Sequence, residues 1–533
     1  MTHINDLPDA VLAQILFKAA ATPAKRLSEW KAKLPLLAVC RAWTKLAIGA
    51  VFNQVYVELP DSLDTSILWT SNADLFISRG SILTARRLTI EWVNEVTPKH
   101  VHSIAKDILK LDRIDWQCIN TLTITKATRT YRRSIGPVSH NEMTVTDVVC
   151  IEQYFAQNLR NIVELNLFHP NYGVTEKYLY NFLVSYYSGR LQVLRANCPI
   201  PFPVTYIARN ISVLELTLDS AAACHLPSIC GETLRVLKLE GIPRNFAWHH
   251  FRYDVFVQPI VFCRLTVLHL AFAPEERGRV STKSEILDKE ESGAHNCDQL
   301  VFPALRELAI DNCTPDCDLL YADLPFPELK SVNIFGTINS ISHCNRLKLS
   351  WVRDLHVSIL ISTSSATVDI YRATNKLFSD ICIGGTATLS MAGKWDIADP
   401  EQMRWVNLTN IQVGEVDYIT VCRAIGRLPN LCELIIFHLS FSNMATDMVS
   451  TSEPLFVSAN PMMAWGENLA ALTIRGFSGV RPITLCFGGI QALIINAGAL
   501  KKLAVPKSAR QDIARFIDKY KDCRPHLANI SVC

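Results

Sequence analysis

The residues best suited to metal chemistry in this chain are cysteines and histidines in its central part. Cys313 and Cys317 are four positions apart, and two further pairs flank them: His295 with Cys297, and His343 with Cys344. Thiolate sulfur and imidazole nitrogen are ligands that zinc prefers. The chain lacks the paired C-x-x-C spacing of structural zinc sites, however, so the pattern favours no metal site.

The sequence contains no recognisable motif for nucleotide binding or for nucleophilic catalysis. The glycine pairs at 384–385 and 488–489 lack the spacing of phosphate-binding loops, which indicates ordinary turns. No Ser, Cys or Asp stands in a nucleophile motif such as G-x-S-x-G. His249 and His250 lie beside Trp248, a pattern that favours a packing or surface cluster. We therefore expect no catalytic residues, no cofactor and no metal, and an enzyme with an unrecognised site is the least favoured alternative.

What the chain does carry is a recurring phrase with apolar residues at positions i, i+3 and i+5, represented by Leu234, Leu237 and Leu239. The last two are two apart, as one buried face of a strand requires. Other clear copies begin at Ile119, Ile162, Ile211, Leu265, Leu305, Leu329, Val352, Met403, Leu431 and Leu469. Weaker copies begin at Ala85, Leu191, Phe378, Ile490 and Leu500. This is the L-x-x-L-x-L phrase of a leucine-rich repeat.

The distance between successive copies supports a repeat array. From residue 211 to residue 431 most copies follow one another at roughly 20–29 residues, the period of leucine-rich repeats. Of the i+8 positions, where regular repeats place Asn or Cys, only that of Cys313 clearly has one of them, so the repeats are divergent. The copies at Ile490 and Leu500 are too close to be two full units. We predict an α/β fold, a solenoid of parallel strands with right-handed connections over residues 61–505.

Amphipathic helices are expected beside these strands. Tyr178, Leu179, Phe182, Leu183 and Tyr186 form an apolar stripe at helical spacing, consistent with the convex side of a repeat. Residues 506–533 are predicted to be a C-terminal cap, with a short amphipathic helix from Arg510 to Tyr520 that has Ile513, Phe516, Ile517 and Tyr520 on one side.

The alternation of a strand also predicts which side chains a partner would meet. Residues at i+2 and i+4 point away from the buried face, toward the concave side of the predicted solenoid. The candidates for partner binding on that side are Glu215, Lys238, His269, Asp354 and His356. Trp405 and Asn407 are placed there by the copy that begins at Met403. The alternative is a solvated sheet face without a partner.

Composition limits the class of protein. The chain has 533 residues, a formal net charge of +3 and only 19% charged residues, which argues against a nucleic-acid-binding footprint and against disorder. Its 17 cysteines are scattered over this length, so most are expected to be reduced thiols. The polar start of the chain and the lack of a long apolar run predict an intracellular protein, cytoplasmic or nuclear, with no membrane partner.

The first 60 residues differ from the repeats, because their apolar pattern is helical. Leu7-Pro8 opens a helical stripe that includes Ile15, and a second helical phrase contains Leu36, Val39-Cys40-Arg41 and Trp43. This region resembles an F-box, and the whole layout is similar to fungal F-box proteins with leucine-rich repeats. F-boxes dock on the Skp-type adaptor of cullin–RING ubiquitin ligases. The resemblance implies adaptor contacts through Leu7, Pro8, Ile15, Leu36, Val39 and Trp43.

The resemblance implies a substrate-recognition subunit of a ubiquitin ligase, whose repeats bind a target protein that the sequence does not name. One alternative is a leucine-rich-repeat scaffold that binds a partner and never engages the adaptor. In that case the helical segment would be a cap that shields the first repeat, as every solenoid needs.

Overall fold

The structure is a computed structural model of the chain. Besides isolated positions, it describes residues 53–59, 70–72, 85–92, 115–126, 155–168, 174–197, 210–218, 232–242, 260–273, 300–314, 326–347, 349–360, 367–379, 385–395, 405–425, 427–440, 468–478, 493–495 and 497–533. The chain divides into two compact units. Unit 1 comprises residues 1–243 and 248–257, and unit 2 comprises residues 244–247 and 258–533.

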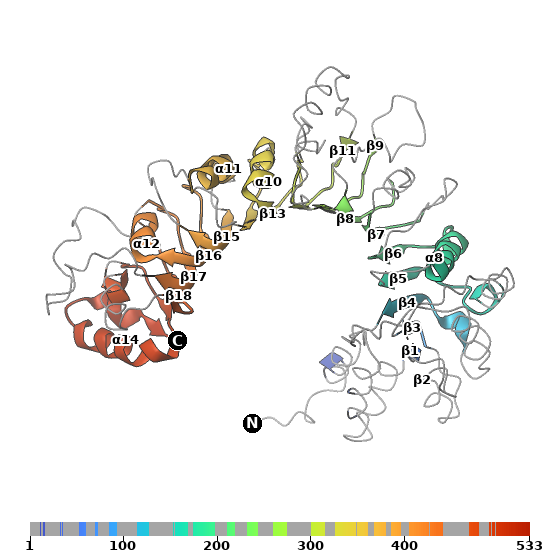
Figure 1. Ribbon diagram of the computed structural model, residues 1–533, viewed down its shortest axis with the longest axis horizontal. Helices are drawn as coiled ribbons and strands as arrows, with labels where there is room; N and C mark the ends of the chain where they lie inside the picture. The colour runs from blue at the N-terminus through green and yellow to red at the C-terminus, as the bar shows by residue number, and fades with distance from the viewer. Residues whose placement is uncertain are drawn as a thin grey trace, which may run out of the picture. The chain divides into compact units, whose positions relative to one another are not determined.

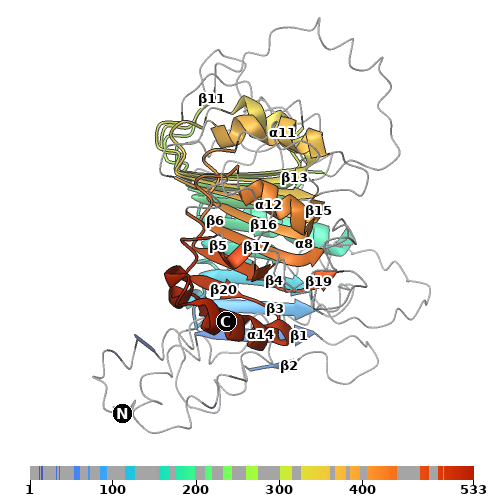
Figure 2. The same ribbon diagram turned by 90° about the vertical axis from the view of Figure 1, so that its left-hand side faces the viewer.

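Unit 1 is built on parallel strands that follow one another in chain order. They are β1 (Gln54–Leu59), β3 (Arg87–Trp92), β4 (Thr121–Lys126), β5 (Glu164–Phe168), β6 (Val193–Ala196), β7 (Val213–Thr217) and β8 (Val236–Ile242). The short β2 (Thr70–Ser71) pairs antiparallel with β1. The 3₁₀ helix η3 (Trp116–Cys118) precedes β4, and helix α8 (Val174–Tyr187) lies between β5 and β6 in sequence. Figure 2 shows β1, β3 and β4 side by side with their arrows in one direction.

Unit 2 repeats this plan. Its parallel strands are β10 (Val267–Phe272), β12 (Glu307–Asp311), β13 (Ser331–Thr337), β14 (Asp354–Leu360), β15 (Thr386–Trp395), β16 (Asn410–Asp417), β17 (Glu433–Ser440), β18 (Ala471–Ile474), β20 (Lys502–Ala504) and β21 (Ser531–Val532). The short β19 (Phe477–Ser478) extends the pairing of β17. Strands β9 (Ile260–Val261) and β11 (Leu300–Val301) form a small parallel sheet of their own.

The helices of unit 2 lie between consecutive strands in the chain. They are α10 (Ile338–His343), η9 (Cys344–Arg346), α11 (Thr367–Ser379), α12 (Tyr418–Ile425), α14 (Lys507–Tyr520) and η12 (Pro525–Asn529). Helices α10, α11 and α12 all cover the same face of the unit 2 strands (Figure 1). In the described part of the chain, no helix is long and apolar enough to cross a membrane.

The apolar phrase forms the core of each unit, as predicted. Leu122, Leu165, Leu194, Leu214 and Leu237 stand directly opposite one another across β4 to β8, and all are buried. The i+5 residues form a second buried row, which includes Leu239. In unit 2 the corresponding row runs through Leu268, Leu308, Val332 and Leu355. Each unit is therefore a stack of parallel strands in sequence order, the arrangement of a repeat solenoid.

The repeat is longer than its sequence phrase, because a further buried residue lies at position i−3. In three successive repeats of unit 2 this residue is phenylalanine: Phe262, Phe302 and Phe326. The rings of the first two stack at 5.2 Å between centroids, and those of the last two lie 6.2 Å apart. The amide of Leu265 donates to the carbonyl of Phe262, and Leu305 donates to Phe302 in the same way. The aromatic residue therefore closes the turn that leads into each strand.

Asparagines at position i−1 join successive turns. The Nδ2 group of Asn161 donates to the carbonyl of Gln117 at 2.7 Å, and that of Asn210 to Gly189 at 2.8 Å. In unit 2 Asn430 donates to Val406 at 2.7 Å, and Asn468 donates to Pro429 at 2.6 Å. Each acceptor lies two positions before the first apolar residue of the preceding repeat. These repeats therefore have an asparagine at i−1, before the apolar phrase, and not at i+8, after it.

The copy predicted at Met403 is out of register. Val406, its second apolar residue, is 50% exposed in the turn before β16. The buried residues are Leu408, Ile411 and Val413, which have the same i, i+3, i+5 spacing. In this register Trp405 is at position i−3 and not on the concave face. It is buried, and its Nε1 group donates to Thr374 Oγ1 at 3.0 Å. Asn407 moves with it to the turn at position i−1.

Two of the weaker copies are helical rather than extended. Phe378 is buried within α11, and the next strand, β15, starts at Thr386. Ile490 is helical, whereas Leu500 and Leu503 are the true phrase that enters β20. An apolar spacing of three or four is common to helices and to this phrase, which explains both errors.

Helix α8 exposes part of the apolar stripe predicted for it. Leu179 and Leu183 are buried, whereas Tyr178 and Tyr186 are exposed. Tyr180, Val184 and Tyr187 are buried instead, so the helix is turned by about one residue.

The two ends of the array contain strands that the pattern did not reveal. Strand β1 lies within the range 1–60 assigned to the helical segment and pairs in parallel with β3. In the segment predicted as the C-terminal cap, α14 buries Ile513, Phe516 and Ile517 as expected, whereas Tyr520 is only partly buried. Beyond it, Leu503 pairs with Val532 of β21. The C-terminal segment therefore contributes a helix and a further strand.

Residues 237 and 238 test the division of each strand into two faces. Leu237→Ala is expected to lower the free energy of unfolding by roughly 2–5 kcal/mol, through lost burial and the cavity that remains. Lys238→Ala removes a partly exposed ion pair with Glu215 and should cost at most about 1 kcal/mol. Urea titration of both variants measures the difference. Equal losses would show that the strand is not buried on one face.

The asparagine contacts predict a position-specific loss of stability. Asn430→Ala should lower the free energy of unfolding by about 0.5–1.5 kcal/mol, because a side-chain hydrogen bond to a backbone carbonyl is lost. Asn407 occupies the same place in its repeat, but its Nδ2 group is 3.5 Å from the carbonyl of Ser379, too long for a strong bond. Asn407→Ala is therefore the matched control, and urea midpoints that fall equally would refute the assignment.

Candidate functional site

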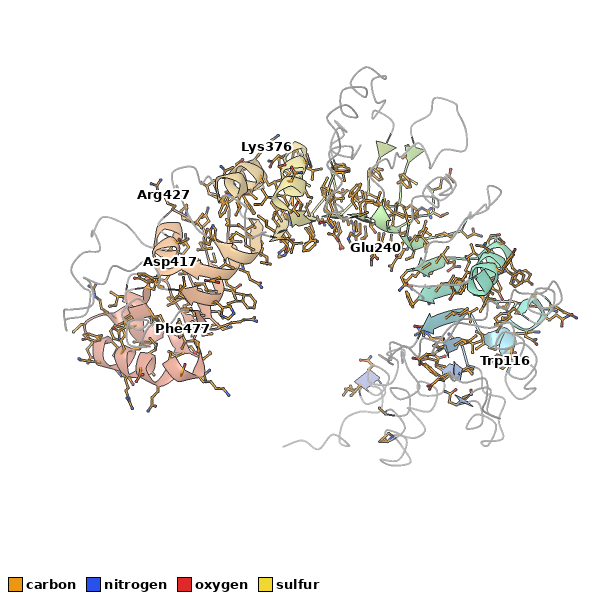
Figure 3. The ribbon with its side chains drawn as sticks, in the orientation of Figure 1. Trp116, Glu240, Lys376, Asp417, Arg427 and Phe477 are labelled. Carbon is orange, nitrogen blue, oxygen red and sulfur yellow. The ribbon has the colours of Figure 1, made fainter. Side chains whose placement is uncertain are left out.

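The candidate site is the face of the strands that carries the i+2 and i+4 side chains, here called the open face. In unit 2 it is the face opposite to α10, α11 and α12 (Figure 1). Figure 3 shows the side chains that project from both faces of the strands, with Glu240 of β8 labelled. Each unit has its own set of open-face contacts.

In unit 1 a row of charged and polar side chains crosses the open face. Asn166, Arg195, Glu215 and Lys238 lie directly opposite one another on β5 to β8. The guanidinium of Arg195 is 3.4 Å from Glu215 Oε2, and Lys238 Nζ is 3.1 Å from Glu215 Oε1. Arg195 also donates to Asn166 Oδ1 at 3.2 Å and to Glu164 Oε1 at 2.7 Å. We call Glu164, Asn166, Arg195, Glu215 and Lys238 the charged ladder.

The charged ladder neutralises its own charges. Its charged side chains are 27–39% exposed, so each ion pair contributes at most about 1 kcal/mol to stability. Their main effect is to hold the side chains in fixed positions across neighbouring strands. Glu215 and Lys238, two of the predicted partner-binding residues, are brought together by this arrangement. Arg195, which connects them to Glu164, was not among the candidates.

The open face is buried at the start of unit 1. The side chains of Gln54, Tyr56, Thr89 and Glu91, on β1 and β3, are all buried although they are polar. Gln54 Nε2 donates to Thr89 Oγ1 at 2.7 Å, and Tyr56 Oη donates to Glu91 Oε2. Burial without such partners would be costly. Asn166 of β5 is also buried, whereas Arg195, Glu215 and Lys238 on β6 to β8 are partly exposed.

In unit 2 the open face carries a histidine–carboxylate pair. His269 Nε2 lies 2.9 Å from Asp311 Oδ2, and both side chains are partly exposed. Asp311 is at i+6 in its repeat. Only positions i+2 and i+4 were considered from the sequence, so Asp311 was not among the candidates. The same alternation would have identified it if the strand had been extended by two residues.

Asp354 and His356 are neighbours on the open face of β14. Asp354 is exposed, as expected, whereas His356 is only partly exposed. His356 lies between Asn333 of β13 and Thr388 of β15, and burial lowers the pKa of its imidazole below the ordinary value of 6.5. His269 and His356 thus lie on the predicted face, and both are only partly exposed.

The structure brings together only some of the candidate residues. Glu215 and Lys238 form an ion pair in unit 1, and Asp354 and His356 share one strand of unit 2. His269 is on β10, separated from β14 by β12 and β13. A partner that contacts all three unit 2 candidates would have to span four strands, about 14 Å at the usual strand spacing.

The cysteines and histidines considered as metal ligands are not gathered into a site within the described part of the chain. Among the described residues no group of three or more His, Cys, Asp or Glu could hold a metal ion. Cys313 is buried and its Sγ lies 3.6 Å from the carbonyl of Thr314. His295, Cys297 and Cys317 lie outside the described residues.

Of the adaptor-binding candidates, one lies in the described part of the chain. Ile15 is helical and 41% exposed. Val11, four residues earlier, is also helical and exposed, so the two are neighbours on one helix face. The other candidates lie outside the described residues: Leu7, Pro8, Leu36, Val39 and Trp43.

Comparison with known proteins does not identify a family. No protein-family model matches the chain, and no curated protein matches it.

The burial of His356 predicts a dependence of stability on pH. Because its pKa is lowered in the folded state, the unfolded chain binds a proton first as the pH falls below 6.5, and folding is then disfavoured. Wild-type protein should lose more stability than His356→Gln between about pH 8 and about pH 5.5. Asn333→Ala, in the same row, changes packing without removing a proton site and is the control. Parallel urea titrations that show one pH slope for wild type and His356→Gln would contradict this.

Proposed function

We propose that this chain is a non-enzymatic substrate-recognition subunit of a cullin–RING ubiquitin ligase. Its N-terminal segment would act as an F-box that docks on the Skp-type adaptor. Its repeats, taken as divergent leucine-rich repeats, would bind the target protein through the open face.

The observation that carries the protein-binding part is the open face itself. The strands bury one row of side chains and present the other, so an extended polar surface lies on a rigid sheet. Repeat proteins use such surfaces to bind other proteins. The charged ladder supports this use, since its side chains are fixed by mutual contacts and lose little freedom on binding.

The adaptor-binding part is supported by sequence and by one structural detail. The phrase Leu7-Pro8 and the phrase from Leu36 to Trp43 resemble the two halves of an F-box. Ile15, which follows the first phrase, exposes an apolar side chain on a helix. Apolar helical surface of this kind is available to a partner helix.

The test of the adaptor-binding part is a double substitution. Leu7→Ala combined with Pro8→Ala should abolish co-precipitation with a Skp-type adaptor, because both contacts of the first phrase are lost. Leu360→Ala removes an exposed apolar side chain of β14 and is the matched control, which should bind normally. Thermal melting of the repeats should be the same in all three proteins.

Wild-type protein that fails to bind any Skp-type adaptor would refute the ligase assignment. The N-terminal segment would then be a helical cap, and the chain a repeat scaffold for protein binding.

A further inference from the structure

Three basic residues occupy the same repeat position on three successive strands of unit 2. Arg306, Lys330 and Arg353 each stand at i+1, just after the first buried residue of their repeats, and all three are exposed. The amide of Lys330 donates to the carbonyl of Arg306 at 2.9 Å, and that of Arg353 to Lys330 at 2.9 Å. The three residues are therefore immediate neighbours at the start of β12, β13 and β14.

This arrangement places three like charges side by side. Neighbouring strands are about 4.8 Å apart, and like charges directly opposite each other destabilise a sheet. Among the described residues, none of these three side chains has an ion pair or hydrogen-bond partner. Arg195 of unit 1 differs, because it contacts two glutamates. The three cations therefore remain available to an anionic partner.

Two of the acidic residues nearest in sequence lie on the other face of these strands, and a third, Glu328, is exposed in the turn two residues before Lys330. Glu307 and Asp354 directly follow Arg306 and Arg353, and successive side chains of a strand point to opposite faces. Their carboxylates therefore belong to the open face, whereas the basic side chains lie at the rim where the strands begin.

An exposed tryptophan stands beside the basic residues. Trp351 is 65% exposed and precedes Arg353 by two residues, in the turn closed by the bond from the amide of Val352 to the carbonyl of Leu349. Tryptophan and arginine are enriched among the residues that dominate protein interfaces. A flat indole next to three unpaired cations is suited to a ligand with both carboxylates and an apolar side chain.

We propose that Arg306, Lys330, Arg353 and Trp351, here called the basic rim, bind an acidic extended segment of a partner protein. Glutamate or aspartate side chains of the segment pair with the cations, and one apolar side chain covers the indole. Side chains on one face of an extended peptide repeat at about 6.8 Å. This distance lies between the spacing of two adjacent strands, about 4.8 Å, and the spacing of β12 from β14, about 9.6 Å. The net charge of +3 on the chain is too small for the footprint of a nucleic-acid-binding protein.

The basic rim goes beyond the proposed function, because it lies away from the open face and does not involve the adaptor. A negative result in the peptide-binding experiment would not affect the interpretation of the adaptor experiment. A negative result in the adaptor experiment would likewise not affect the peptide-binding experiment.

The experiment uses the full chain and a fluorescein-labelled peptide in an anisotropy titration. The peptide has Glu at alternate positions, Ser between them and one central Leu, over about twelve residues, enough to cross three strands. A second peptide with Gln in place of Glu is the ligand control. We expect binding of the Glu peptide only, and weaker binding as salt is added.

Reversing the charge of all three basic residues should weaken binding of the Glu peptide. The combined variant Arg306→Glu, Lys330→Glu, Arg353→Glu should bind the Glu peptide at least about tenfold more weakly. Lys501→Glu is the matched control, because Lys501 is exposed at the same repeat position of β20 and its neighbour Ala470 is uncharged. Its affinity should equal that of wild type. If the combined variant does not fold, as judged by circular dichroism, Arg353→Gln alone should weaken binding severalfold.

The tryptophan is tested separately. Trp351→Ala should weaken binding severalfold, whereas Val406→Ala, which removes another exposed apolar side chain from a turn of unit 2, should not. Unchanged affinity in the charge variants, an equal loss in Lys501→Glu, or equal binding of the Gln peptide would overturn the proposal.

Discussion

The fold depends on the burial of one row of apolar side chains between neighbouring strands. A single repeat presents only a few leucines and cannot cover them itself, so each strand is stable only when another lies against it. The rows through Leu214 and Leu237 in unit 1 and through Leu308 and Val332 in unit 2 meet this need. The turns add to the same stacking, since the rings of Phe262 and Phe302 and the bond from Asn430 to Val406 also join successive repeats.

This constraint leaves the other side chains of each strand free to vary. In unit 1 these positions carry alternating charges, and Arg195 contacts a carboxylate on each side. In unit 2 they carry a histidine paired with Asp311 and a second histidine, His356, whose neighbours limit its access to water. At the rim of the same strands, the cations of Arg306, Lys330 and Arg353 have no ion-pair partner among the residues that the structure describes. One scaffold thus supports surfaces with different electrostatic character.

The sequence predicted the fold where periodicity alone decides it. Leu237 and Leu239 are buried, and the charged residue between them points to the other face, because a strand alternates with a period of two. The phrase failed where another element has the same apolar spacing, as at Phe378 in a helix and at Val406 in a turn. The pairing of Glu215 with both Arg195 and Lys238 could not be predicted, since it depends on which residues stand opposite across strands. The partial burial of His356 likewise depends on Asn333 and Thr388, which are distant in sequence.

One spacing in unit 2 shows how tolerant this construction is of added chain. Strands β10 and β12 pair in the same register as their neighbours, although Leu265 and Leu305 are farther apart in sequence than the starts of most other repeats. Closing a loop becomes harder only logarithmically with its length, by about 0.6 kcal/mol for each doubling. Sequence can therefore be inserted between strands at little thermodynamic cost. Such connections are places where an array of this kind could acquire new recognition elements during evolution while its core stays unchanged.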